Sequence, residues 1–276
     1  RRPPRSTQGV SSAASDVYKR QLVDLGLKDK VVLISGSYRG TGAGTARVFA
    51  REGAIVAVHG HEEGQPDDVV QQIRDQGGNA VAVHGSVTTT AGVESIISQT
   101  EQGCGPVDVL VNNYGTPGNT SWSDPAQHWH EAWETNVVAG VRLTQSVLPA
   151  MKKRKWGRII FLGTVGTERP GRNNPDYYAA KAALPVVVRS LAKELRDSGV
   201  TANLISPGII ATDEVREMLE KRASRHGVQG WEEVQRWALE NVTPNLTGRI
   251  PDPEEIGRYI AFLSSESAWH LSLIHI

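Results

Sequence analysis

The most informative stretch of the chain is residues 31–42, VVLISGSYRGTG. Four apolar residues and a serine, typical of a buried strand, run directly into a turn with three glycines, Gly36, Gly40 and Gly42, and a helical pattern follows. Glycine has no Cβ atom, so the backbone N–H groups of such a turn and the start of the helix can approach a phosphate closely. On its own the pattern is also compatible with a plain strand-to-helix turn.

The same order of strand, turn and helix repeats along the chain from Lys30. Short apolar runs predict strands, which we expect to be buried on both faces, at 31–35, 54–58, 80–83, 107–112, 157–163 and 200–206. Helical spacing lies between them, at 42–52, 66–77, 90–102, 124–153, 178–197 and 253–265. This alternation predicts an α/β fold: a single-domain, Rossmann-like, doubly wound parallel sheet with helices on both faces and ligands at the carboxyl ends of the strands.

The two ends of the chain differ from its middle. Residues 1–21 are basic, rich in Ser and Pro and without hydrophobic periodicity, so we expect a disordered tail. VYKRQ at 17–21 and LSLIHI at 271–276 resemble translated sequencing-adapter read-through, and we expect both tails to be artefacts of the sequence record, although a short terminal strand at 271–276 stays open. The folded domain should span 22–270. Its polar, helix-prone excursion at 209–249 follows a strand's carboxyl end, where a substrate lid is well placed.

Composition excludes several classes of protein. The 276 residues carry 30 Lys and Arg against 30 Asp and Glu. A formal net charge of zero gives no general attraction to nucleic acid or to an anionic membrane, and no apolar run approaches the roughly 20 residues that span a bilayer. The single cysteine, Cys104, and the lack of clustered Cys and His predict no disulfide and no metal site. We expect a cytoplasmic protein that binds a small molecule.

Several motifs follow the glycine turn, whose spacing is GxxxGxG, in a fixed order. NNxG is formed by Asn112, Asn113 and Gly115; the others are Asn136, Thr164, the YxxxK pair Tyr177 and Lys181, and PGxxxT with Pro207, Gly208 and Thr212. Together they make residues 30 to about 270 resemble the classical short-chain dehydrogenase/reductases, and among them the 3-oxoacyl-[acyl-carrier-protein] reductases. The resemblance implies an NAD(P)-dependent oxidoreductase that interconverts a ketone and a secondary alcohol, and a homo-oligomer, dimer or tetramer, formed through helices at 90–102 or 124–153 and 178–197.

The resemblance also implies a role for each catalytic candidate. Tyr177 is the acid/base, Lys181 lowers its pKa and binds the nicotinamide ribose, Thr164 replaces a serine that bonds the substrate oxygen, and Asn136 bends its helix and holds a water beside the lysine. The Tyr–Lys pair has a physical reason, because an ammonium about 4 Å from a phenolate stabilises it by up to roughly 4 kcal/mol at an effective dielectric of 20. Two departures, the methyl group of Thr164 and the bulk of Tyr114, predict a narrower pocket.

The identity of the dinucleotide depends on charge. NAD sites usually place an acid after the second strand, but here that strand is followed by Gly60 and His61, and the first acid is Glu62. Arg39 lies where similar enzymes hold a cation against the 2′-phosphate of NADP. We therefore favour NADP(H), and NAD(H) stays open because Glu62 or Glu63 could reach a ribose. The predicted dinucleotide site comprises Gly36, Ser37, Arg39, Gly40, Thr41, Gly42, His61, Ser86, Val87, Asn113, Gly115, Tyr177, Lys181, Pro207, Gly208, Ile210 and Thr212.

Other functions of this fold also stay open. One is a catalytically silent NADP-binding sensor or scaffold, against which the intact set of Asn136, Tyr177 and Lys181 argues. Another is a nucleotide-sugar epimerase or dehydratase, which uses the same pair but usually a longer chain. The sequence also stops before the family's last strand, so we expect the C-terminal strand to be missing.

Overall fold

The computed structural model describes residues 24–272, and in this part of the chain six parallel strands form one sheet. The strands are β1 (Val31–Ile34), β2 (Ile55–Gly60), β3 (Asn79–His84), β4 (Val109–Asn112), β5 (Gly157–Leu162) and β6 (Val200–Ile205). Their order is β3-β2-β1-β4-β5-β6, so the strand order reverses between β1 and β4. This is the doubly wound arrangement that the sequence predicts, with a crevice at the reversal.

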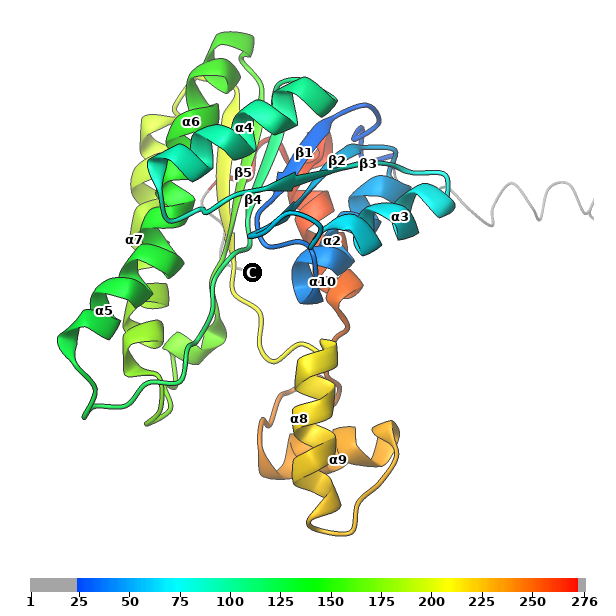
Figure 1. Cartoon of the computed structure of the whole chain (residues 1–276), viewed down its shortest axis with the longest axis vertical. Coiled ribbons are helices and arrows are strands. Elements are labelled where there is room, and N and C mark those ends of the chain that lie inside the picture. The colour runs from blue at the N-terminus through cyan, green and yellow to red at the C-terminus, as the bar shows by residue number, and fades with distance from the viewer. Residues whose placement is uncertain (1–23, 273–276) are drawn as a thin grey trace, which may run out of the picture.

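Helices cover both faces of the sheet (Figure 1). One face is covered by α2 (Gly40–Arg51), α3 (Asp67–Asp75) and α10 (Pro253–Ser264), the other by α4 (Thr90–Cys104), α6 (Ala139–Arg154) and α7 (Pro175–Glu194). The remaining helices are α5 (Ala126–Trp133), α8 (Asp213–Ser224) and α9 (Trp231–Asn241), with short helical segments η1 (Glu134–Val138), η2 (Val165–Thr167) and η3 (Glu266–Ala268).

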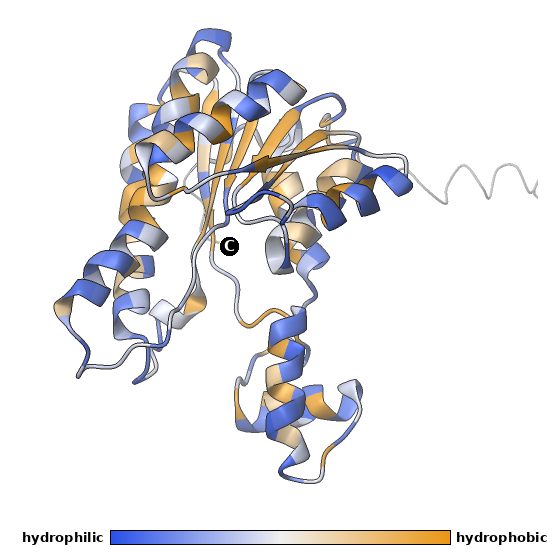
Figure 2. Ribbon diagram, viewed as in Figure 1, coloured by the Kyte–Doolittle hydropathy of each residue, from blue (hydrophilic) through white to orange (hydrophobic). Residues whose placement is uncertain are grey.

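The core follows the alternation of side chains along each strand. In β1, Val32 and Ile34 pack with α2 and α10, whereas Leu33 packs with the helices of the opposite face. Figure 2 shows the result, an apolar sheet between helices whose outer faces are polar. The expectation that every strand is buried on both faces is wrong for the edge strand β3, where Asn79 and Ala82 are exposed, whereas β6, at the opposite edge, is buried and has residues 271–272 beside it.

Two helix predictions need correction at their boundaries. The helix predicted at 178–197 begins three residues earlier, at Pro175, which occupies the first turn. Proline suits this position because its nitrogen has no hydrogen to leave unpaired. The helix predicted at 124–153 is divided by the π-helical turn Glu134–Val138, which contains Asn136.

Residues 209–250, here called the lobe, form a small helical unit of their own. Its core is made by Ala211, Leu219, Ala223, Val234, Ala238 and Ile250, and it is separate from the two cores of the sheet. Figure 1 shows α8 and α9 projecting beyond the sheet on the side to which the chain leaves β6. The lobe therefore coincides with the excursion that the sequence predicts at 209–249.

The end of the described chain lies beside β6. The Asn203 side chain donates to the carbonyl of Leu271 (2.8 Å), and the Ala202 N–H donates to the Ser272 hydroxyl (3.3 Å). Within residues 24–272 there is no seventh strand. The predicted tail at 1–21 and residues 273–276 lie outside the described residues. None of the helices between residues 24 and 272 is both long and apolar enough to cross a membrane.

Candidate active site

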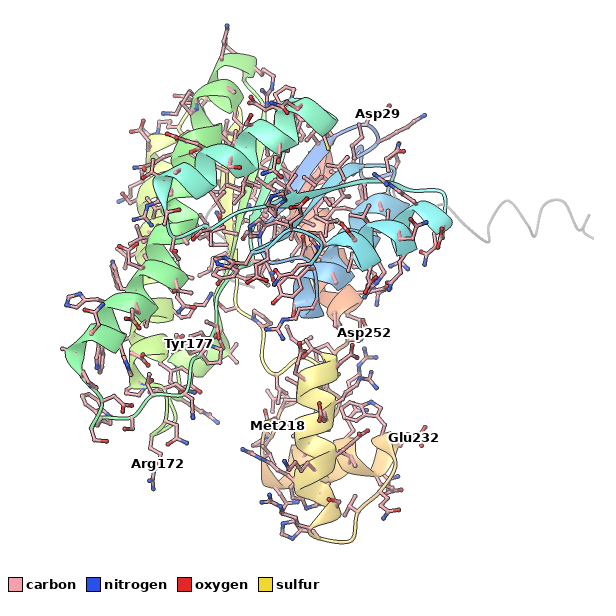
Figure 3. The ribbon with its side chains drawn as sticks, in the orientation of Figure 1. Asp29, Arg172, Tyr177, Met218, Glu232 and Asp252 are labelled. Atoms are coloured by element: carbon pink, nitrogen blue, oxygen red, sulfur yellow. The ribbon has the colours of Figure 1, made fainter. Side chains whose placement is uncertain are left out.

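A cavity of about 910 Å³ opens at the carboxyl ends of the strands, between the sheet and the lobe. It brings together most of the residues predicted from the sequence: Gly36, Arg39, Gly40, Thr41, Asn113, Gly115, Thr164, Tyr177, Lys181, Pro207, Gly208, Ile210 and Thr212. In Figure 3 the labelled Tyr177 and Met218 mark its two sides, the sheet side and the lobe side.

Other predicted residues lie outside the cavity lining. Ser37 is buried, and its hydroxyl donates to the Ile34 carbonyl (2.7 Å). Ser86 bonds to Thr88, Val87 is buried in the core, and His61 is exposed after β2. Gly42 and Asn136 also lie behind the lining and support it.

The glycine turn has the shape that a phosphate requires. Gly36 has a φ of +64°, which favours glycine, and a Cβ on Gly42 would lie 2.5 Å from the Gly36 carbonyl oxygen. Helix α2 begins at Gly40 with neither a side-chain cap nor an acidic residue in its first turn. The first N–H groups of a helix lack partners within it and carry partial positive charge, so the start of α2 fits the diphosphate of a dinucleotide.

His59 holds this turn from behind. Its Nδ1 accepts from the Gly36 N–H (2.9 Å), so the proton lies on Nε2, which donates to the Gly85 carbonyl (2.9 Å). Burial lowers the pKa of His59 to about 4, with smaller contributions from nearby groups, and the ring is therefore neutral at neutral pH. The sequence does not predict this role of His59, because the bond joins residues that are distant in the chain.

Lys181 lies at the bottom of the cavity. The side chain is buried, and its Nζ donates to the Leu162 carbonyl at the end of β5 (2.8 Å). Burial lowers the pKa of Lys181 to about 8. Gly115 makes room for it, because a Cβ at this position would lie 2.8 Å from Nζ.

Tyr177 lies one helical turn before Lys181 on α7, as the YxxxK spacing predicts. The structure does not show the expected net lowering of its pKa by Lys181: burial, followed by the neighbouring Tyr178, raises the pKa of Tyr177 to about 12, and this outweighs any stabilisation of the phenolate by the ammonium. The Lys181 ammonium bonds to a backbone carbonyl instead. The phenol is therefore protonated at neutral pH, the form that can donate a proton.

Thr164 begins the η2 turn directly after β5. Its Oγ1 accepts from the Gly166 N–H (3.1 Å), and its own backbone carbonyl accepts from the Thr167 hydroxyl (2.9 Å). The bond from Gly166 orients the Thr164 side chain and leaves the hydroxyl hydrogen available, so the group can donate to an oxygen in the cavity.

Asn136 supports the loop that follows β4. Its Oδ1 accepts from the Thr116 N–H (3.1 Å), and its Nδ2 donates to the carbonyls of Ala132 (3.0 Å) and Thr116 (3.2 Å). The bond to Ala132 lies beside the π-helical turn. Asn136 therefore contacts the site through backbone, directly behind Gly115.

A second support, which the sequence does not predict, fixes the start of α7. Thr120 and Asn174 exchange two hydrogen bonds of 2.9 Å, and the Thr120 hydroxyl donates to the buried Asp176 carboxylate. Asp176 also accepts from the Tyr177 N–H (2.8 Å). Pro175 at the first helical position and the acidic Asp176 after it are sequence signals for this helix start.

The chain is similar to known proteins along most of its length. The short chain dehydrogenase family matches residues 30–223. The chain is 32% identical over 251 residues to the 3-oxoacyl-[acyl-carrier-protein] reductase FabG of Escherichia coli, covering 90% of this chain and 95% of that protein. It is 31% identical over 245 residues to the D-beta-hydroxybutyrate dehydrogenase of Cupriavidus necator, covering 88% and 93%.

Solved structures of reductases are also similar to this chain. L-sorbose reductase from Gluconobacter frateurii, complexed with NADPH and L-sorbose, superimposes with a TM-score of 0.84 at 28% identity, covering 92% of this chain and 96% of that one. A 3-oxoacyl (acyl-carrier-protein) reductase from Agrobacterium tumefaciens with NADP bound gives 0.80 at 31% identity, covering 94% and 96%. The chain belongs to the short-chain dehydrogenase/reductase family and is an NAD(P)-dependent oxidoreductase acting on CH–OH and carbonyl groups.

Proposed function

We propose that this protein interconverts a ketone and a secondary alcohol with NADP(H), using Tyr177 as acid/base. The observation that carries the proposal is the convergence of Thr164, Tyr177 and Lys181 on one cavity whose far end is the glycine turn. A silent dinucleotide sensor would need the turn but not the three catalytic side chains.

Arg39 supports NADP(H) as the cofactor. Its side chain is 62% exposed at the cavity, beside the glycine turn, and no carboxylate directly follows β2. Two similar structures contain NADPH or NADP. A cation at this position favours a 2′-phosphate over a ribose hydroxyl.

The residues of this chain supply the proton and position the substrate. When bound, NADPH supplies the hydride. The Thr164 hydroxyl donates to the carbonyl oxygen and stabilises the negative charge that develops there. Tyr177, which carries its proton at neutral pH, transfers that proton to the same oxygen. The Lys181 ammonium offers electrostatic stabilisation to the phenolate that remains.

The part of the cavity beyond Tyr177 supports an uncharged substrate. Its lining includes Val165, Tyr178, Ile209 and Met218, and the charged side chains that line the cavity among the described residues are Arg39, Lys181 and Glu214. Arg39 and Glu214 are paired beside the glycine turn, and Lys181 is bonded to backbone. Lys181 is buried beside the catalytic Tyr177, so a carboxylate elsewhere on the substrate would lose its hydration without gaining a counter-ion. Residues 209–249 are proposed to act as the substrate lid.

A spectrophotometric panel of neutral and anionic carbonyl compounds with NADPH and NADH tests this function. We expect turnover with NADPH, with neutral ketones and keto esters preferred to the corresponding keto acids. Tyr177→Phe should lower kcat by about 10³-fold, within the range usual for loss of an acid/base, without weakening NADPH binding. Tyr259→Phe, which changes an exposed tyrosine of α10 outside the cavity lining, is the control and should keep full turnover. Equal turnover by both variants would contradict the mechanism, and NADPH binding without turnover of any carbonyl would favour the sensor.

The homo-oligomer also remains a proposal. The helices expected at its interface include α7, where Val186 is 63% exposed. Light scattering tests the assembly, and a monomer at micromolar concentration would contradict it.

A further inference from the structure

Arg39 is paired with a carboxylate across the mouth of the cavity. Its Nη1 lies 2.8 Å from Oε1 of Glu214, in the first turn of α8. The two residues are 175 positions apart in the chain, and the pair joins the glycine turn to the lobe. The cation proposed to bind the 2′-phosphate therefore already has an anionic partner.

The Glu214 carboxylate is held in place by its own helix start. Partial burial acts to raise its pKa, but hydrogen bonds from its own backbone N–H and from the Thr212 hydroxyl, together with Arg39, keep the pKa of Glu214 below its usual value. Thr212 caps α8, and its methyl group would lie 3.5 Å from a Cβ on Gly40. The start of α8 thus lies against the glycine turn, and Glu214 is ionised at neutral pH.

We propose that Glu214 is a specificity-determining residue, which competes with the 2′-phosphate of NADP(H) for Arg39. The inference rests on the proposed function, in which Arg39 holds that phosphate. Glu214 holds the guanidinium through Nη1 and neutralises its charge, so a phosphate binds Arg39 less tightly while this ion pair is present. NAD(H) carries a hydroxyl at this position and can bind while the ion pair stays intact. Glu214 therefore weakens the preference for NADP(H) that Arg39 alone would give.

The expected effect is small because the pair is exposed. The two side chains are 62% and 50% accessible to solvent. Exposed ion pairs contribute so little that their loss changes an equilibrium by about two- to five-fold. Simple repulsion between Glu214 and the phosphates would also weaken binding, but it would not depend on Arg39.

The experiment measures dissociation constants of NADPH and NADH by titration of nicotinamide fluorescence at low salt. Glu214→Gln should tighten NADPH by about two- to five-fold and leave NADH unchanged. Glu217→Gln removes the same charge one turn later on α8 and should leave both constants unchanged. Arg39→Ala should weaken NADPH, and in the Arg39→Ala background Glu214→Gln should have no effect.

The outcomes separate the inference from the function on which it rests. If Arg39→Ala weakens NADPH but Glu214→Gln behaves like Glu217→Gln, the competition is wrong and the cofactor assignment stands. If Glu214→Gln tightens NADPH equally without Arg39, repulsion replaces competition and the inference is overturned. If Arg39→Ala changes nothing, both are wrong.

Discussion

The two walls of the cavity are built differently. On the sheet side, the side chains of Thr164 and Lys181 bond to backbone groups of the α/β part of the chain, here called the body. Tyr177 lies on a helix whose start is fixed by the buried Asp176. On the lobe side, the lining comes from α8, which packs on a small core of its own and reaches the glycine turn through an exposed ion pair. Proton transfer requires catalytic groups at fixed positions, which the sheet side provides. The lobe side is less firmly held, so the substrate that the cavity accepts can change with it.

Removing the Lys181 ammonium from the sheet side should have the largest effect on activity. Lys181→Met keeps much of the buried volume but removes the charge that stabilises the phenolate, so kcat/KM should fall by about 10³-fold. Lys193→Met, on an exposed position of the same helix, is the control. Steady-state kinetics measure the effect, and a loss below ten-fold in a folded variant would remove Lys181 from the mechanism.

The lobe can be weakened separately. Leu219 is fully buried in the lobe core, so Leu219→Ala should cost about 3 kcal/mol of local stability. Hydrogen exchange should speed up in α8 and α9 but not in β5, and KM for the carbonyl should rise. Glu220→Ala, at an exposed position of α8, is the control and should change neither the exchange rates nor KM. Equal loss of protection in β5 would show that the lobe and the body unfold as one unit.

The buried His59, on the sheet side, should make the free energy of unfolding depend on pH. Its pKa falls from 6.5 to about 4 on folding, so the unfolded chain binds a proton below pH 6.5 that the native protein does not, and stability declines between these values as pH falls. At pH 5 the loss is about 2 kcal/mol. Denaturant unfolding of wild type and His59→Asn from pH 7 to 5 measures it. The wild type should lose more stability than the variant, and identical slopes would contradict the role of His59.

The smallest effect concerns the extra methyl group of Thr164. Thr164→Ser keeps the hydroxyl, so kcat/KM for a small ketone should change by less than about three-fold. For a bulky ketone kcat/KM should increase by more than it does for the small one, because removing the methyl group widens the pocket. Thr167→Ser is the neighbouring control. A large loss for every ketone would mean that the methyl group, rather than the hydroxyl, positions the substrate.

The sequence predicts which residues share one helix or strand better than it predicts contacts between different helices, strands and loops. Tyr177 and Lys181 share a helix face because four residues complete about one turn, and apolar runs of strand length predict the sheet. The bonds of His59 to Gly36 and of Arg39 to Glu214 join separate segments, and no spacing encodes them. The direction of the Tyr177 pKa was also missed, because burial cannot be read from a motif.

The most direct test follows a labelled hydride. NADPH deuterated at the transferable position of C4 is mixed with the enzyme and an accepted ketone, and the alcohol is analysed by mass spectrometry. The wild type should place deuterium on the carbinol carbon, while Tyr177→Phe, binding NADPH equally well, should transfer almost none. Equal transfer by the two proteins, or an alcohol without deuterium, would contradict a reductase in which Tyr177 delivers the proton.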